Sequence, residues 1–365
     1  MWQRIIHAGV FGGEDVAQIV HLPTFVSLSR LFKVKIICDI SLKTATHCAN
    51  RFGIPRPTTD PTEVFNDSEI DAVVVITSDE FHGPYAIAAL QAGKHVFVEK
   101  PMTLSLEVAK EIIDAEFSAP NGARVFVGYM RRYAPDLNAF KHEVASVDCI
   151  KFDDIPAEAE KYRKEKLQAL LGQAWGIPSA DLSPEQMNYC CLLANLGSHG
   201  LSLMREVLGG LPSEVLASTD NARWYTTMFE YQNKSNDERF TCLYETGINF
   251  VPRFDSQVAI FGENKSVSIN YDTPFVGGLG ITVKIDELNE YGEKSHRSLQ
   301  TSYEDAYSAE LREWYDCIVN GKAIKTTCSD AVEDLKLFKM MMDKYPAYKR
   351  AKGSCGSDEF LPSGP

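Results

Sequence analysis

A lysine that follows a strand-like run is the clearest candidate for chemistry. The run His95–Glu99 continues into Lys100 and Pro101, giving the sequence HVFVEKP. Ligands of parallel sheets bind beyond the carboxyl ends of the strands, so Lys100 is predicted to lie at the ligand edge. Partial burial lowers the pKa of a lysine, which suits proton transfer near neutrality. The alternative is an ordinary surface lysine, because lysines are usually exposed.

A glycine-rich turn after the first predicted strand could approach a diphosphate. Residues 9–17 read GVFGGEDVA, and the dinucleotide fingerprint is GxGxxG/A between a strand and a helix. Gly12 and Ala17 take the first and third positions, but Glu14 holds the second. A carboxylate there opposes a diphosphate unless the loop shifts or Glu14 turns outward, and Gly13 could then supply the close approach. The alternative is an ordinary strand–helix turn.

An aspartate at the end of the second predicted strand strengthens the dinucleotide hypothesis. Asp39 closes the run KVKIICD and lies within reach of the acidic position that usually follows the fingerprint. A carboxylate there accepts hydrogen bonds from the ribose hydroxyls and repels a 2′-phosphate, so it favours NAD, while the nearby Lys43 leaves NADP possible. The alternative is an aspartate that caps a helix or closes a turn.

The elements that must position these residues alternate through the first third of the chain. Predicted strands and helices follow one another at a spacing typical of an α/β domain with a doubly wound parallel sheet. The strands are 5–11, 33–39, 71–77, 95–99 and 124–127, and the helices are 16–31, 42–52, 85–92 and 104–117. We therefore predict a Rossmann domain, for binding NAD(P), over residues 1–125.

The pattern changes after this domain. A helix is expected at 157–171, and strand-like runs between 214 and 285 predict a mainly antiparallel sheet, before helices at 303–319 and 330–343. We predict an α+β domain for substrate binding and oligomerisation over residues 126–350. The segment 351–365 is rich in Gly, Ser and Pro, and we expect it to be disordered.

The composition excludes several classes of function. The 365 residues carry a net charge of −13, which disfavours binding to nucleic-acid phosphates. No apolar run is long enough to span a membrane, and the N-terminus lacks the pattern of a signal peptide. The nine cysteines include no CxxC pair, and the eight histidines include no HxH or HExxH. We expect a reduced, cytoplasmic protein without a metal site.

The segment 77–101 resembles one oxidoreductase family. It reads TSDEFHGPYAIAALQAGKHVFVEKP and is similar to the glucose–fructose oxidoreductase, inositol dehydrogenase and MocA (GFO/IDH/MocA) family. The resemblance implies an NAD(P)-dependent oxidoreductase acting on CH–OH groups of sugars, cyclitols or related small molecules, with or without net redox change. It also implies a homo-oligomer, a dimer or a tetramer. Lys100 would be catalytic, and Thr77, His82, Glu99 and Lys100 would border the cofactor.

Two further motifs place substrate residues by the same resemblance. Residues 128–135 read GYMRRYAP and align Arg132 and Tyr133 with residues at the entry to the second domain, where they could hold a substrate oxygen or simply pack a hinge. Residues 195–202 read NLGSHGLS and resemble the family's DxGxHxxD segment. His199 would be catalytic and substrate-binding, unless it is a helix-start histidine satisfied by backbone.

Two differences keep a second function open. Asn195 and Ser202 stand where that family segment has aspartates; Asn195 can bind a hydroxyl but cannot act as a base. Together with Glu14 these changes are compatible with a non-catalytic dinucleotide-binding sensor, whereas Lys100 and His199 favour an enzyme.

Motifs in the later strands, at 244–255 and 271–274, resemble a fungal-type subgroup of the family.

Overall fold

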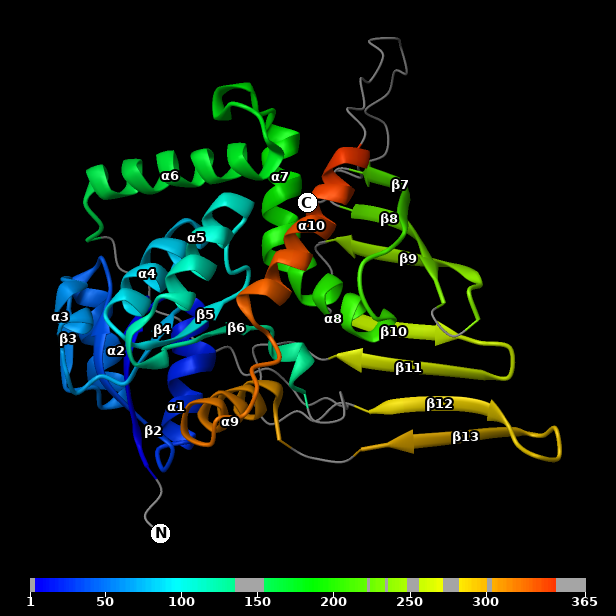
Figure 1. Cartoon of the computed structure of the whole chain (residues 1–365), viewed down its shortest axis with the longest axis horizontal. Helices are drawn as coiled ribbons and strands as arrows, with labels where there is room; N and C mark the ends of the chain where they lie inside the picture. Colours follow the sequence, from blue (N-terminus) through cyan, green and yellow to red (C-terminus); the bar gives the residue numbers. More distant parts are fainter. Residues whose placement is uncertain are drawn as a thin grey trace, which may run out of the picture. The chain divides into compact units, whose positions relative to one another are not determined.

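The first sheet follows the predicted doubly wound topology. The structure is a computed structural model that describes residues 4–134, 154–221, 224–233, 236–247, 256–271, 282–300 and 304–345. Six parallel strands are arranged in the order β3-β2-β1-β4-β5-β6 (Figure 1). They are β1 (Ile6–Phe11), β2 (Phe32–Cys38), β3 (Arg56–Thr58), β4 (Ala72–Val75), β5 (His95–Glu99) and β6 (Val125–Gly128). Strand order reverses between β1 and β4, which places a ligand edge at their carboxyl ends.

Local sequence explains how these elements begin and end. Strand β4 reads AVVV and is buried along its whole length, as expected for a central parallel strand covered on both faces. Helix α2 (Leu42–Phe52) begins after Ser41, whose hydroxyl accepts a hydrogen bond from the Thr44 N–H, and ends at Gly53 in the left-handed conformation. The predicted bounds of this helix are confirmed.

Three predicted helices of this domain have different bounds. The first was expected over 16–31, but a π-helical turn, η1 (Ala17–His21), leads into α1 (Leu22–Ser27), and residues 28–31 form a turn. Helix α4 (Asp79–Gln91) starts six residues before the predicted Tyr85, because Asp79 and Glu80 open its first turn despite Pro84 inside the helix. The short α3 (Thr62–Phe65) was not predicted, and α5 (Leu106–Phe117) starts two residues later than expected.

A long helical region follows. Helix α6 (Ala157–Trp175) extends four residues past its predicted end at 171 and is capped by Gly176; it packs against α4. Helix α7 (Pro184–Leu192) continues through a second π-helical turn, η6 (Leu193–Gly197), into α8 (Ser198–Leu208). π-helical turns are rare and occur often at functional sites, and η6 lies inside the NLGSHGLS motif.

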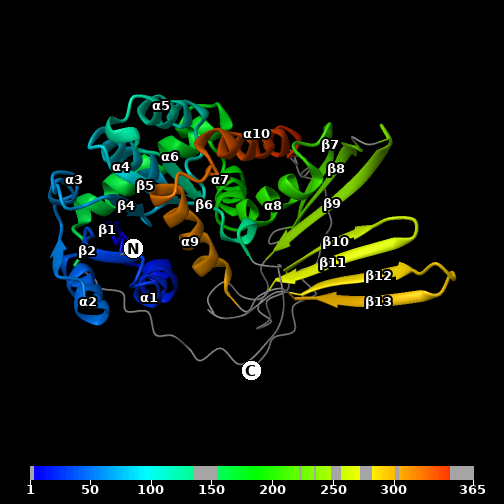
Figure 2. The same cartoon turned by 60° about the horizontal axis from the view of Figure 1, so that its bottom comes forward.

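The later strands form two antiparallel sheets among the described residues. One contains β7 (Glu214–Asn221), β8 (Trp224–Gln232) and β9 (Arg239–Gly247). The other is a meander of β10 (Ser256–Phe261), β11 (Lys265–Tyr271), β12 (Val283–Leu288) and β13 (Lys294–Leu299) (Figure 2). The antiparallel pairing is confirmed. Parts of the motifs at 244–255 and 271–274, together with the tail 351–365, lie outside the described residues.

A helix from late in the chain completes the core of the first sheet. Helix α9 (Ala306–Val319) places Trp314 in a stacked contact with Phe32, their ring centroids 5.4 Å apart, and the Tyr315 hydroxyl donates to the Arg4 carbonyl at 2.6 Å. By packing, residues 1–211 and 250–339 form one compact unit, and residues 212–249 with 340–365 form a second, which includes the end of α10 (Cys328–Lys344). The functional boundary at residue 125 stays a prediction.

Candidate functional site

The glycine turn after β1 is tied to the aspartate after β2. The Gly13 N–H donates to Oδ2 of Asp39 at 2.8 Å, and the Ser41 N–H donates to Oδ1 at 2.8 Å. Burial is the largest cause of the raised pKa of Asp39, while these two backbone donors lower it. The carboxylate therefore fixes the position of the turn, in addition to any contact with a ribose.

The turn has the form of a cradle that only glycine permits. Gly12 has φ 95°, and an added Cβ would lie 2.4 Å from the Ile76 carbonyl oxygen at the end of β4. A Cβ on Gly13 would lie 2.9 Å from Cγ2 of Thr44. Glu14 is exposed, so the carboxylate at the second fingerprint position turns toward solvent. These residues fit a dinucleotide diphosphate next to the start of a helix.

The strand end at Glu99 is held by a buried contact with a histidine. Oε1 of Glu99 lies 2.7 Å from Nε2 of His21, which belongs to the π-turn η1, and Oε2 accepts from the Lys100 N–H at 3.0 Å. Burial alone would raise the pKa of Glu99, but His21 and Lys100 outweigh it and lower the pKa overall. Glu99 thus helps to position the backbone of Lys100, and both of its carboxylate oxygens have partners within the protein.

A second buried acid lies near Glu99. The side chain of Glu310 from α9 is fully buried, and neither of its oxygens has a hydrogen-bond partner within the part of the chain that is described. Burial, and then the charge of Glu99, raise the pKa of Glu310 well above its usual value. The two neighbouring acids are thus shifted in opposite directions, and burial favours the protonated form of Glu310.

Lys100 contacts the second π-turn. Its ammonium donates to the Asn195 carbonyl at 3.0 Å and to the Ala194 carbonyl at 3.5 Å, and the Lys100–Pro101 peptide bond is cis. Burial lowers the pKa of Lys100, the charges of Glu99 and Asp79 raise it, and that of Arg131 lowers it further; the net direction is down. The lysine is thus poised to exchange a proton at a lower pH than a surface lysine.

His199 brings a second proton-handling group to the same place. It is the second residue of α8, and its Nδ1 is buried with no partner among the described residues. Burial, followed by the charges of Lys100 and Arg131, lowers the pKa of His199 well below its usual value. The neutral form of the ring is therefore favoured, and its unpartnered nitrogen is available to a substrate hydroxyl.

Arg131 is the residue that sequence reasoning missed. Its guanidinium lies over the Tyr271 ring, 5.0 Å from the centroid, and its charge acts on both Lys100 and His199. The motif GYMRRYAP contains two adjacent arginines, Arg131 and Arg132. The family pattern aligns with Arg132, so Arg131 was not predicted as a site residue.

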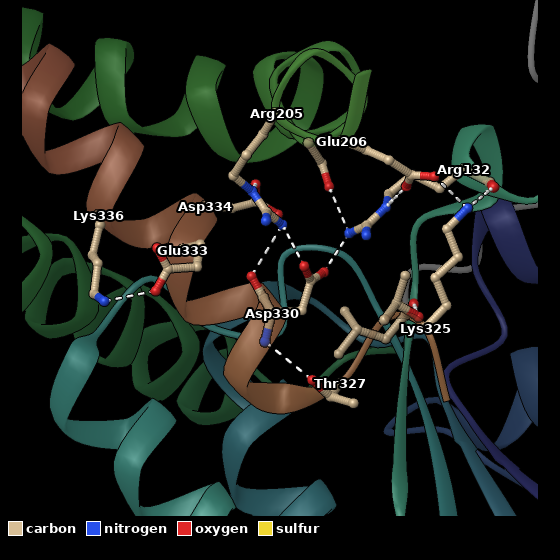
Figure 3. A network of polar contacts seen from close by, with 12 residues as sticks. Arg132, Arg205, Glu206, Lys325, Thr327, Asp330, Glu333, Asp334 and Lys336 are labelled. Carbon is tan, nitrogen blue, oxygen red and sulfur yellow. Dashed lines mark hydrogen bonds and ion pairs between the residues drawn. The ribbon is translucent and has the colours of Figure 1, made fainter. Parts of the chain in front are cut away.

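Arg132 instead sits in a network of ion pairs (Figure 3). Its side chain is 5% exposed and pairs with Glu206 of α8 and with Asp330 of α10. Asp330 also accepts from Arg205 at 2.9 Å. These contacts occupy the guanidinium and support the hinge-packing alternative over substrate binding. Ser202 follows the same pattern, since its hydroxyl accepts from Arg132 at 3.4 Å.

Three other predicted site residues, Thr77, His82 and Tyr133, make hydrogen bonds within the protein. The Tyr133 hydroxyl lies 2.8 Å from Oγ1 of Thr326, and its ring stacks on Phe126. His82 bridges two carbonyls, with Nδ1 2.7 Å from the Pro101 oxygen and Nε2 3.0 Å from the Thr77 oxygen. His82 and Thr77 therefore brace the loop after β5, whereas the Asn195 side chain is exposed and contributes its backbone to Lys100.

Two kinds of site are absent from the described residues. No group of three or more His, Cys, Asp or Glu side chains in the described ranges has an arrangement that could hold a metal ion. Over the same ranges, no helix combines the length and the apolar character needed to cross a bilayer.

Comparisons with known proteins agree with this geometry. Residues 6–129 match the GFO_IDH_MocA family, described as an oxidoreductase family with an NAD-binding Rossmann fold. The chain is 25% identical over 319 residues to the scyllo-inositol 2-dehydrogenase (NAD(+)) of Bacillus subtilis, covering 83% of this chain and 84% of that protein. It is also 25% identical over 342 residues to the inositol 2-dehydrogenase 2 of Saccharopolyspora erythraea, covering 89% and 87%.

Solved structures share the fold over most of the chain. The 3-ketoreductase KijD10 from Actinomadura kijaniata, in a complex with NADP and TDP-benzene, superposes with a TM-score of 0.66 at 16% identity, covering 94% of this chain and 98% of that one. The aldose-aldose oxidoreductase from Caulobacter crescentus gives a TM-score of 0.66 at 17% identity, covering 93% and 97%. These likenesses confirm the predicted α/β fold.

The fold and the match of the first domain define an NAD(P)-binding oxidoreductase. Residues 6–129 match the NAD-binding Rossmann domain of the GFO/IDH/MocA oxidoreductase family.

Proposed function

We propose that this protein is an NAD(P)-dependent dehydrogenase acting on a hydroxyl-bearing carbon of a cyclitol, a sugar or a related small molecule. The observation that carries the proposal is the convergence of Lys100 and His199. The lysine follows β5 and contacts the π-turn η6, and η6 runs directly into the helix that carries the histidine. Two basic groups with lowered pKa values thus meet beyond the ligand edge of the sheet.

The residues present divide the work. Gly12, Gly13 and Asp39 would hold the diphosphate and the adenosine ribose. The bound nicotinamide would accept or supply the hydride. Lys100 withdraws the hydroxyl proton during oxidation and returns it during reduction, and the neutral His199 binds the reacting oxygen through Nδ1. The charge of Arg131 acts on Lys100 and His199, and it would also stabilise negative charge that develops on the reacting oxygen.

Features of the chain and its relatives support the substrate class. Two full-length relatives are named inositol dehydrogenases, and they align over most of this chain. A polyol offers a neutral secondary hydroxyl, which suits a site whose proton carriers are a lysine and a histidine. The same pair could also run a closed redox cycle, in which the hydride returns to the substrate with no net oxidation.

The remaining predictions about context belong to this proposal. We infer a cytoplasmic homo-oligomer, a dimer or tetramer, of a fungal-type subgroup, with Rossmann and substrate domains divided near residue 125. The two antiparallel sheets of the later strands support the oligomer.

The test begins with the purified chain. Native mass spectrometry would show which dinucleotide co-purifies and how many subunits carry it. NADH fluorescence titration would then measure binding, and a panel of inositols, sugars and cyclic ketones would be assayed for a change in NADH absorbance. We expect NAD(H) binding and turnover of at least one polyol. Failure of both NADH and NADPH to bind would contradict the proposal.

A further inference from the structure

The start of helix α2 is covered by a carboxylate from a distant part of the chain. The Ser41 hydroxyl donates to Oδ1 of Asp154, and the Lys43 N–H donates to Oδ2 at 3.3 Å. The serine and the aspartate are 113 residues apart, and Asp154 lies just before helix α6. An acid from the region after the Rossmann domain is therefore bound to the first turn of a Rossmann helix.

The same serine joins this acid to the cofactor turn. The Ser41 N–H donates to Asp39, and Asp39 in turn accepts from the Gly13 N–H. Burial is the main cause of the raised pKa of Asp39, and the negative charges of Glu14 and Asp154 add to it. The carboxylates of Asp39 and Asp154 thus both accept hydrogen bonds from Ser41, at the place where β2 ends and α2 begins.

This place decides which dinucleotide a Rossmann domain accepts. The acid after the second strand binds the 2′-hydroxyl of the adenosine ribose, and the 2′-phosphate of NADP needs positive charge or free donors nearby. The first turn of a helix normally offers such donors, because its N–H groups are unpaired and its dipole is positive. Here the Ser41 hydroxyl and the Lys43 N–H are already bonded to Asp154.

We propose that Asp154 is a second residue that selects the cofactor, and that it excludes the 2′-phosphate by occupying the donors a phosphate would use. The inference rests on the proposed dinucleotide function and adds a residue to it. On this proposal Asp154, rather than a 2′-phosphate, engages the Lys43 N–H. The pKa of Asp154 is lowered first by the Ser41 hydroxyl and further by the Lys43 N–H and the Lys43 charge, so the acid stays ionised and opposes a second anion.

The experiment compares dissociation constants, measured by fluorescence titration of the full chain with NADH and with NADPH. In Asp154→Asn we expect NADPH to bind about tenfold more tightly, equivalent to about 1.4 kcal/mol, while the NADH constant changes by less than about twofold. The control is Glu160→Gln, which removes one negative charge from α6, where Glu160 pairs with Lys164. It should leave both constants unchanged.

The outcomes separate this inference from the proposed function. An equal change in both constants for Asp154→Asn would mean that Asp154 only tethers the start of α6, and would overturn the inference. If Asp154→Asn changed neither dissociation constant, the inference would also be overturned, but the dehydrogenase proposal would stand because NADH still binds. Absence of binding of either cofactor to the unaltered chain would overturn both. The preference for NADH should also narrow at high salt, because Asp154 is only partly buried.

Discussion

The ammonium of Lys100 donates to the backbone carbonyl of Asn195, not to its side chain, at 3.0 Å. The family resemblance emphasised the identity of residue 195, because an amide there replaces a carboxylate. The contact depends instead on the π-turn that carries the carbonyl, so any residue that keeps the turn can keep the contact. The loss of an aspartate therefore leaves the position of Lys100 intact.

Replacing Lys100 with methionine keeps most of the side-chain length but removes the ammonium. We expect turnover of a confirmed substrate to fall by about 10²–10⁴-fold, the usual range for a positioned acid–base group, with NADH binding largely intact. The measurement is steady-state kinetics beside fluorescence titration. Lys110→Met is the control, since Lys110 is an exposed lysine of α5 paired with Asp114. Normal turnover in Lys100→Met would assign the proton to His199.

The pH dependence of oxidation should report the same lysine. Burial lowers its pKa from the ordinary 10.5, and Lys100 must be neutral to accept the hydroxyl proton. We therefore expect kcat/KM for oxidation to rise with pH through a transition below 10.5, and this transition should be absent in Lys100→Met. A profile of identical shape in the variant would count against the assignment.

Two glycine substitutions test the cofactor cradle. Gly12→Ala would place a Cβ 2.4 Å from the Ile76 carbonyl oxygen at a positive φ, so we expect loss of NADH binding and lower stability. Gly53→Ala, also at a positive φ, meets no atom within 4 Å and should cost only the backbone strain, about 1–2 kcal/mol. Thermal unfolding and NADH titration of both variants measure the difference. Equal NADH affinity in the two variants would remove the role given to Gly12.

Arg132 should prove structural. Arg132→Met removes the buried cation between Glu206 and Asp330, which keep Lys325 and Arg205 as partners, so we expect a loss of about 1.5–3 kcal/mol in the free energy of unfolding. Any remaining folded protein should keep the substrate KM. Urea unfolding measures the first effect, and Arg312→Met, which breaks an exposed pair with Glu304, should cost no more than about 1 kcal/mol. A stable variant with a greatly raised KM would restore Arg132 as a substrate residue.

Glu310 should make the protein less stable as pH rises. Its pKa is raised in the folded state above the ordinary 4.5, so its stabilising contribution is complete below that pH and is lost as pH rises toward the folded pKa. Glu310→Gln lacks this loss. Its stability relative to the unaltered chain should grow above pH 4.5 by up to about 1.4 kcal/mol per pH unit.

Urea unfolding at several pH values measures the effect of Glu310. The matched control is Glu313→Gln on the same helix, where Glu313 forms a partly exposed pair with Lys322. This control should not reproduce the slope. A pH-independent difference between Glu310→Gln and the unaltered chain would show that Glu310 is ionised in the folded protein.

The sequence predicted five of the six strands of the first sheet because these strands are short, apolar and bounded by turn residues. The edge strand β3 was missed, since its three residues, RPT, show no apolar run. Helix α2 is confirmed to the residue because Ser41 and Gly53 mark its ends. The π-turns at 17–21 and 193–197 could not be predicted, since no periodicity distinguishes them from α-helix. Their effect is to place His21 and the carbonyl of Asn195, which are both close to the candidate site.

The site residues that were misplaced share one physical cause. Arg131 and Arg132 are adjacent and chemically identical, so only the direction of each side chain separates the one near Lys100 from the one that pairs with Asp330. Long-range ion pairs set that direction, and Asp330 lies 198 residues away in the sequence. Asp154 was missed for the same reason, since nothing in its local sequence indicates a contact with Ser41.

The stacking of Trp314 on Phe32 constrains how the chain can be made and divided. The core of the first sheet includes Leu311, Trp314 and Tyr315, which the ribosome delivers long after β6 is complete. Until then, apolar surface on β2 and α1 has no cover, and a nascent chain in this state is exposed to aggregation. A recombinant fragment that stops at residue 125 should consequently require the α9 peptide, supplied in trans, to become well folded.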